Sequence, residues 1–108
     1  MTQAILPITD LPAQALDAAA HFHAEYLPQA RELLEGPVDA LLLHFPSDDP
    51  AQRGWQLAAV QSLARMAAPK RVNGIAGPEQ PSAADIADWL EAAPGITGQL
   101  LRFGGNAL

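Results

Sequence analysis

The sequence has no cysteine, and this excludes both a disulfide framework and a zinc site built on thiolates. Positive charge is scarce as well: 6 Lys and Arg stand against 12 Asp and Glu, too few for the basic footprint of sequence-independent nucleic-acid binding. Aromatic residues make up only 6% of the chain, and alanine and leucine dominate its apolar residues, which favours helices over an all-β sandwich. No stretch approaches the ~20 apolar residues of a membrane span, so we expect no membrane partner.

The residues that are present point to one globular domain. A chain of 108 residues, 49% of them hydrophobic, can bury a single core, and we expect one α/β domain over residues 1–108. The first ten residues have neither a basic segment nor a long apolar run. They do not resemble a signal peptide, so a cytoplasmic location is expected.

Short apolar segments alternate with longer helical ones. Residues 38–45 are apolar almost without interruption, which is typical of a strand covered on both faces. Pro7 lies in the first such segment and lacks a backbone donor, so this strand is expected at a sheet edge. The predicted strands are residues 4–8, 38–45, 71–76 and 99–103.

Helices are predicted between the strands, each bounded by proline or glycine. Pro28 is expected to break or kink the first helix. Asp49 gives the second an N-cap residue before Pro50, and Ser82 with Asp85 resembles a capping box for the third. The β-α-β-α-β-α-β order predicts a mostly parallel four-stranded sheet in two or three layers. The predicted helices are residues 12–35, 50–68 and 82–93.

Two segments of the second half carry a recognisable pattern. An Ala-Ala pair at residues 58–59 leads, through Ser-Leu-Ala-Arg at 62–65, to an Arg-Val-Asn-x-Ile strand at 71–75. An Ile-Thr-Gly-Gln-Leu-Leu run follows at 96–101, with a Gly-Gly pair behind it. In order and spacing, roughly residues 54–105 resemble the C-terminal half of the short-chain dehydrogenases/reductases. The resemblance implies a Rossmann-like half-domain whose strands take the places of that family's fourth to seventh strands.

The resemblance does not extend to the family's cofactor and catalytic motifs. No glycine precedes Gly36, so the Gly-rich turn that binds the cofactor pyrophosphate has no counterpart. The family's Tyr-x-x-x-Lys motif ends immediately before the Ala-Ala pair, where this sequence has Arg53 and Leu57. Neither can replace the tyrosine or the lysine, because arginine is no proton donor at neutral pH and leucine cannot bind a ribose. We therefore assign no cofactor, no catalytic residue and no enzymatic activity.

Histidines and carboxylates form a further cluster in the first predicted helix. His21 and His23 lie ~200° apart around a helix and cannot easily share an ion, whereas His21 and Glu25 are one turn apart. His44 could complete a metal site only if the fold brought it close. The same residues also fit polar positions on a partly solvated helix, and we assign no metal.

Weak candidates for ligand contacts are Ser47, Arg53 and Asn73. The first two follow the strand at residues 38–45, where α/β sheets place their ligands. Arg53 fits either an anion contact or a solvated surface position. The neighbouring Asp48 and Asp49 fit either a carboxylate pair or an N-cap residue with its neighbour.

The strongest expectation about a partner concerns one face of the sheet, which the helices of the chain would leave uncovered. If the strands follow in sequential order, right-handed crossovers put all three helices on one face. The other face would then expose more apolar area than soluble monomers tolerate, so we expect a partner to cover it or pair across it. The helix at residues 50–68 is a second candidate surface, because its counterpart in the resembling family is commonly buried between subunits. The candidate interface residues are Leu41, Leu43, Trp55, Ala59, Leu63 and Met66.

The function expected from these features is that of a non-catalytic oligomerisation or protein-interaction module. It would form a homodimer or higher homo-oligomer, or accompany a larger protein. Two alternatives remain open: an accessory subunit or ligand-binding relative of an NAD(P)-dependent oxidoreductase, and a small-molecule sensor.

Overall fold

Four parallel strands form one sheet in the sequential order β1-β2-β3-β4, the arrangement that the family resemblance implies. The computed structural model describes residues 2–103. Within that part of the chain, no helix is both long and apolar enough to cross a membrane. The elements are β1 (Gln3–Pro7), α1 (Ala15–His21), η1 (Phe22–Tyr26), α2 (Leu27–Glu35), β2 (Ala40–Phe45), η2 (Pro50–Gln52), α3 (Arg53–Ala67), β3 (Arg71–Ala76), α4 (Pro81–Glu91) and β4 (Leu100–Arg102).

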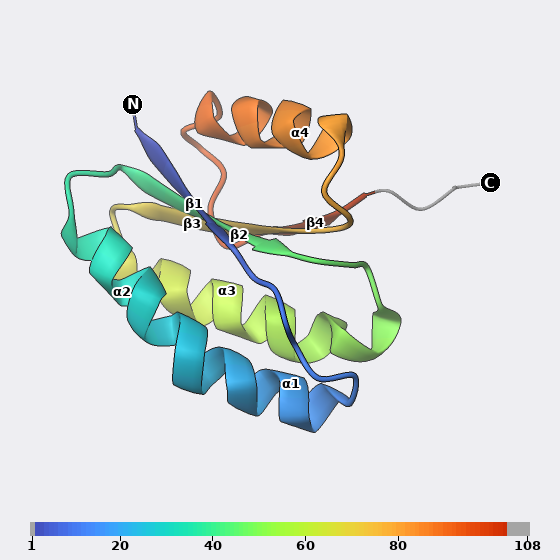
Figure 1. The fold of residues 1–108 in the computed structure, drawn as a ribbon. Helices are drawn as coiled ribbons and strands as arrows, with labels where there is room; N and C mark the ends of the chain where they lie inside the picture. The colour runs from blue at the N-terminus through green and yellow to red at the C-terminus, as the bar shows by residue number, and fades with distance from the viewer. Residues whose placement is uncertain (1, 104–108) are drawn as a thin grey trace.

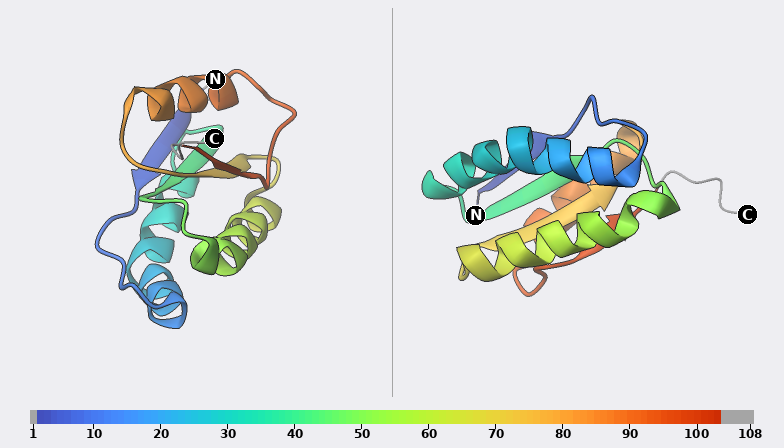
Figure 2. Two further views of the ribbon diagram at one scale, coloured as in Figure 1. Left: turned by 90° about the vertical axis from the view of Figure 1, so that its right-hand side faces the viewer. Right: turned by 90° about the horizontal axis from the view of Figure 1, so that it is seen from below.

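Helices cover both faces of the sheet, so the expected α/β half-domain has three layers (Figures 1 and 2). Helices α1, α2 and α3 lie on one face, and α4 lies on the other. The expectation that all three connections place their helices on one face is therefore wrong. Successive strands step in the same direction across the sheet, so the β3–α4–β4 connection has the opposite hand to the two before it.

The side chains of β2 explain why both faces need a helix. All six of its residues are buried, and their side chains alternate between the two faces. Leu41 and Leu43 belong to the larger core under α1, α2 and α3. Leu42 belongs to a smaller core with Ile75 and Leu90 under α4. The face that was expected to be bare is thus covered from within the chain.

Two polar side chains of β3 fix α4 on its face. The buried guanidinium of Arg71 donates to the carbonyl oxygens of Leu90, Glu91 and Ala93, at 2.9, 3.2 and 3.0 Å, and so caps the C-terminal end of α4. Asn73, which is also buried, donates to the carbonyl of Ile96 at 2.9 Å. Both contacts can form only if α4 and the loop behind it lie on this face.

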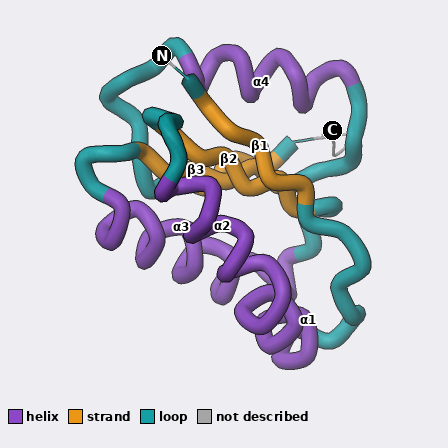
Figure 3. Tube along the Cα trace, turned by 60° about the vertical axis from the view of Figure 1, so that its left-hand side comes forward, coloured by secondary structure: helices purple, strands orange, loops and turns teal. Residues whose placement is uncertain are grey.

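The first helical stretch runs without a break from residue 15 to residue 35, but it is not one regular helix (Figure 3). A π-helical segment, η1, separates α1 from α2. Pro28 lies in the first turn of α2, where a missing backbone N–H is tolerated. The predicted break at Pro28 therefore takes the form of a widened turn just before the proline.

Of the two predicted helix N-caps, the one at Asp49 is confirmed and the one at Ser82 is wrong. Asp49 accepts a hydrogen bond from the backbone of Ala51 at 3.0 Å, which confirms it as a cap before a 3₁₀ turn. The predicted capping box at Ser82 is wrong, because α4 begins one residue earlier and its N-cap, Gln80, makes no capping side-chain bond. Ser82 instead accepts a hydrogen bond from the side chain of Gln80 at 2.8 Å.

Replacing Arg71 by methionine tests how α4 is held. Arg71→Met leaves three carbonyls without their cationic donor, and we expect a loss of about 3 kcal/mol in the free energy of unfolding. Urea denaturation followed by circular dichroism measures this loss. The matched control is Arg65→Met at an exposed position on α3, which should change stability by less than about 0.5 kcal/mol. Equal stability of the two variants would contradict the proposed role of Arg71.

Candidate functional site

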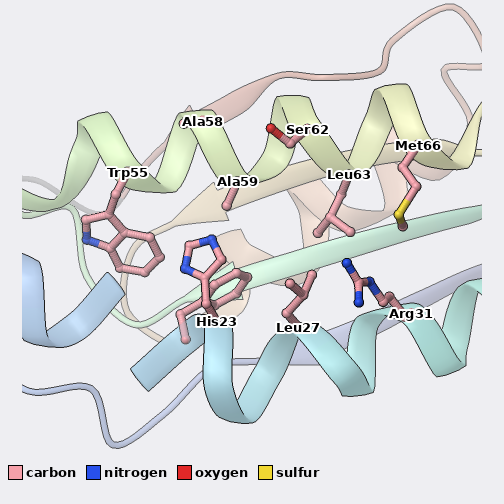
Figure 4. Close-up of a pocket in the computed structure, with 10 residues that line it drawn as sticks. His23, Leu27, Arg31, Trp55, Ala58, Ala59, Ser62, Leu63 and Met66 are labelled. Carbon is pink, nitrogen blue, oxygen red and sulfur yellow. The ribbon is translucent and has the colours of Figure 1, made fainter. Parts of the chain in front are cut away.

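A groove of about 250 Å³ separates the first helical stretch from α3 (Figure 4). Most of its lining is apolar, and it is open to solvent. Its lining residues are Phe22, His23, Leu27, Arg31, Trp55, Ala58, Ala59, Ser62, Leu63 and Met66.

Helical spacing brings one wall of the groove together. Trp55, Ala59, Leu63 and Met66 recur every three or four residues along α3, so they share one face of that helix. Ala59 and Leu63 are buried at the bottom, whereas 54% of Met66 is exposed at the rim. Figure 4 shows Leu27 opposite this wall.

An aromatic cluster closes one end of the groove. The ring of Phe22 lies 5.4 Å from that of Trp55 and 5.8 Å from that of Phe45, measured between ring centres. The indole nitrogen of Trp55 donates to Gln52 at 2.6 Å, and Gln52 in turn donates to the carbonyl of Ala13 at 3.0 Å. These contacts fix the start of α3 against the loop that precedes α1.

The polar groups at the groove do not form a catalytic constellation. His23 uses one ring nitrogen on the carbonyl of Ala19, and the hydroxyl of Ser62 accepts from Arg65. Arg31 is exposed beside Met66, and residues 2–103 offer it no ion pair. No nucleophile here lies beside a base, so the groove is suited to apolar contact and not to acid–base chemistry.

The structure separates the six candidate interface residues into two groups. Trp55, Ala59, Leu63 and Met66 line the groove together. Leu41 and Leu43 have no exposed surface at all, because they lie beneath the helices in the larger core. Their burial removes the bare-face argument that singled them out, and the helical face is left as the candidate surface.

The three weak ligand candidates do not meet at one site. Ser47 is exposed after β2. The guanidinium of Arg53 pairs with both carboxylate oxygens of Asp48, at 3.1 and 3.2 Å, so its charge is already compensated. Asn73 is buried on the α4 side, where it also accepts from the backbone of Gln99 at 3.0 Å.

His44 does not join His21, His23 and Glu25 in a metal site. Residues 2–103 contain no group of three His, Asp or Glu side chains that could hold a metal ion. His44 lies across the sheet on the α4 side, where its ring nitrogens face the carbonyl of Gly77 at 2.9 Å and the carboxylate of Glu79 at 3.3 Å. Tyr26 is held by Thr9, whose carbonyl oxygen accepts from the phenol at 2.6 Å.

Sequence reasoning missed the second wall of the groove. Phe22 and Leu27 both contribute to it although they are five residues apart, a spacing that a regular α-helix does not place on one line. The π-helical segment between them restores that alignment. The only sequence signal for this was Pro28, which indicated an irregular turn without indicating its kind.

Comparison with known proteins identifies a related family. A family model described as SDR-like, short chain dehydrogenase-like protein, matches residues 6–103. No curated protein and no solved structure matches the chain.

Truncation of Phe22 tests the aromatic end of the groove. Phe22→Ala opens a cavity beside Phe45 and Trp55, and we expect the free energy of unfolding to fall by about 3–5 kcal/mol. Leu16→Ala on the neighbouring α1 is the control, since 85% of Leu16 is exposed and its loss should cost less than about 0.5 kcal/mol. Thermal or urea unfolding of both variants provides the comparison, and a cost below 1 kcal/mol for Phe22→Ala would argue against the cluster.

Proposed function

Since this chain belongs to the SDR-like family of short chain dehydrogenase-like proteins, we propose that it is a non-catalytic member that associates with a second copy of itself through the helical groove. The single observation that carries this proposal is the apolar groove between α2 and α3, with its half-exposed Met66.

The positions that resemble the family's catalytic motif support the non-catalytic part of the proposal. Arg53 and Leu57 stand in the first turns of α3, where the resemblance implies tyrosine and lysine. The guanidinium of Arg53 is paired with the carboxylate of Asp48, and the side chain of Leu57 carries no polar group. Neither side chain can move a proton to or from a substrate carbonyl at neutral pH.

Charge supports a second copy as the occupant of the groove. Helix α3 carries Arg65 and no acidic residue, and its Arg53 is paired with Asp48, whereas α2 carries Glu32 and Glu35 beside Arg31. In a two-fold arrangement, α3 of each copy would face α2 of the other, so the exposed Arg65 beyond the groove on one helix would meet the acidic residues of the other. The exposed part of Met66 would then be buried near the axis.

Association is tested by the native mass of the purified protein in a light-scattering dilution series. We expect a dimer or larger oligomer at micromolar concentration. Met66→Glu places a charge at the groove and should raise the dissociation constant at least about tenfold. Trp89→Glu is the matched control, because Trp89 is 57% exposed on α4, across the sheet. A mass of 11.4 kDa at all concentrations would contradict the proposal.

Cofactor binding is tested separately by titration with NAD(H) and NADP(H), followed by intrinsic tryptophan fluorescence or calorimetry. We expect no saturable binding, because the sequence has no Gly-rich turn at which a helix N-terminus could receive the pyrophosphate. The double variant Arg53→Tyr with Leu57→Lys should likewise show no hydride transfer. Saturable binding by the unmodified chain would overturn the non-catalytic assignment.

A further inference from the structure

Strand β1 forms one edge of the sheet, and its backbone shows which groups point outward. Thr2 accepts from the backbone of Ala40, and Ile8 donates to the carbonyl of His44, so the even-numbered residues bond to β2. In a parallel ladder the residues between them direct their N–H and C=O groups away from the partner strand. The outward-facing residues of β1 are therefore Gln3, Ile5 and Pro7.

Only Ile5 offers an open donor and an open acceptor at this edge. The backbone N–H of Gln3 donates to the carboxylate of Glu91 at 3.1 Å. Pro7 has no N–H. No residue of the described chain bonds to the N–H or C=O of Ile5, and half of its side chain is exposed.

The pattern fits an antiparallel strand from a second copy, centred on Ile5. In that register the two Ile5 residues exchange both of their hydrogen bonds, as a hydrogen-bonded antiparallel pair does. The next such pairs bring Gln3 of each copy opposite Pro7 of the other. Pro7 can only accept a hydrogen bond in these pairs, so the one available donor is the backbone N–H of Gln3. That N–H already donates to the carboxylate of Glu91.

We propose that Glu91 closes the β1 edge against strand addition by a second copy. With the carboxylate in place, the two-fold pairing has only the two bonds between the Ile5 residues. Without it, two further bonds form, one from each Gln3 N–H to the carbonyl of the facing Pro7. Glu91 reaches this position from the last turn of α4, on the face that Gln3 also contacts through its side chain, whose amide donates to Ala87 at 3.1 Å. Edge strands that lack such protection are sites of uncontrolled association.

The experiment compares Glu91→Ala with Asp85→Ala, which removes the same charge from an exposed position on the same helix, α4. Both changes are made in the Met66→Glu background, so that groove-mediated association does not contribute. Sedimentation equilibrium from 10 µM to 1 mM (about two decades) should show Glu91→Ala associating at least about tenfold more tightly than Asp85→Ala. Adding Ile5→Pro, which removes the last open donor, should abolish the gain.

Two further measurements keep the test decisive. Glu91→Gln retains an acceptor for the Gln3 N–H and should not associate. In the unmodified protein, the amide of Gln3 should exchange with solvent at least about tenfold more slowly than that of Ile5. Equal association of Glu91→Ala and Asp85→Ala, a gain that survives Ile5→Pro, or equal exchange of the two amides would each overturn the proposal. Failure of the groove proposal would leave these comparisons intact, because both variants share the same background.

Discussion

The whole arrangement depends on one constraint: the six residues of β2 are buried on both sides of the strand. A strand of this kind is stable only if each face of the sheet receives apolar cover. The first helical stretch and α3 supply it for Leu41, Leu43 and Phe45. The chain has only the segment between β3 and β4 left for the other face, and α4 is the helix that this segment forms.

Three cationic side chains hold helix ends in this architecture. Arg71 caps the C-terminal end of α4, and the preceding Lys70 donates to the carbonyls of Leu34 and Gly36 at the end of α2. The start of β3 therefore fixes a helix on each face of the sheet. Arg53 is paired with Asp48 at the start of α3. Three of the 6 Lys and Arg residues of this protein thus hold helix ends in place.

The sequence predicted the strands better than the faces. Residues 71–76 were placed without error, because proline and glycine bound a short apolar run there. The face of α4 could not be inferred from the preference for right-handed crossovers, which this connection violates. The signal lay in Arg71 and Asn73, two polar residues inside a buried strand that needed backbone partners. The groove was half predicted: the α3 stripe is periodic, whereas its partners Phe22 and Leu27 align only through a π-helical turn.

Two surfaces of the molecule remain able to meet another chain, and they differ in how they are protected. The edge of β1 is limited by Pro7, which has no donor, and by Glu91, which occupies the donor of Gln3. No polar side chain protects the groove in the same way. Met66 is half exposed there, and Arg31 forms no ion pair within the described residues. Backbone pairing at an open edge is indiscriminate, whereas a groove between helices selects its partner by shape and charge. Closure of the edge by Glu91, as proposed above, would direct association to the groove, the surface that can be specific.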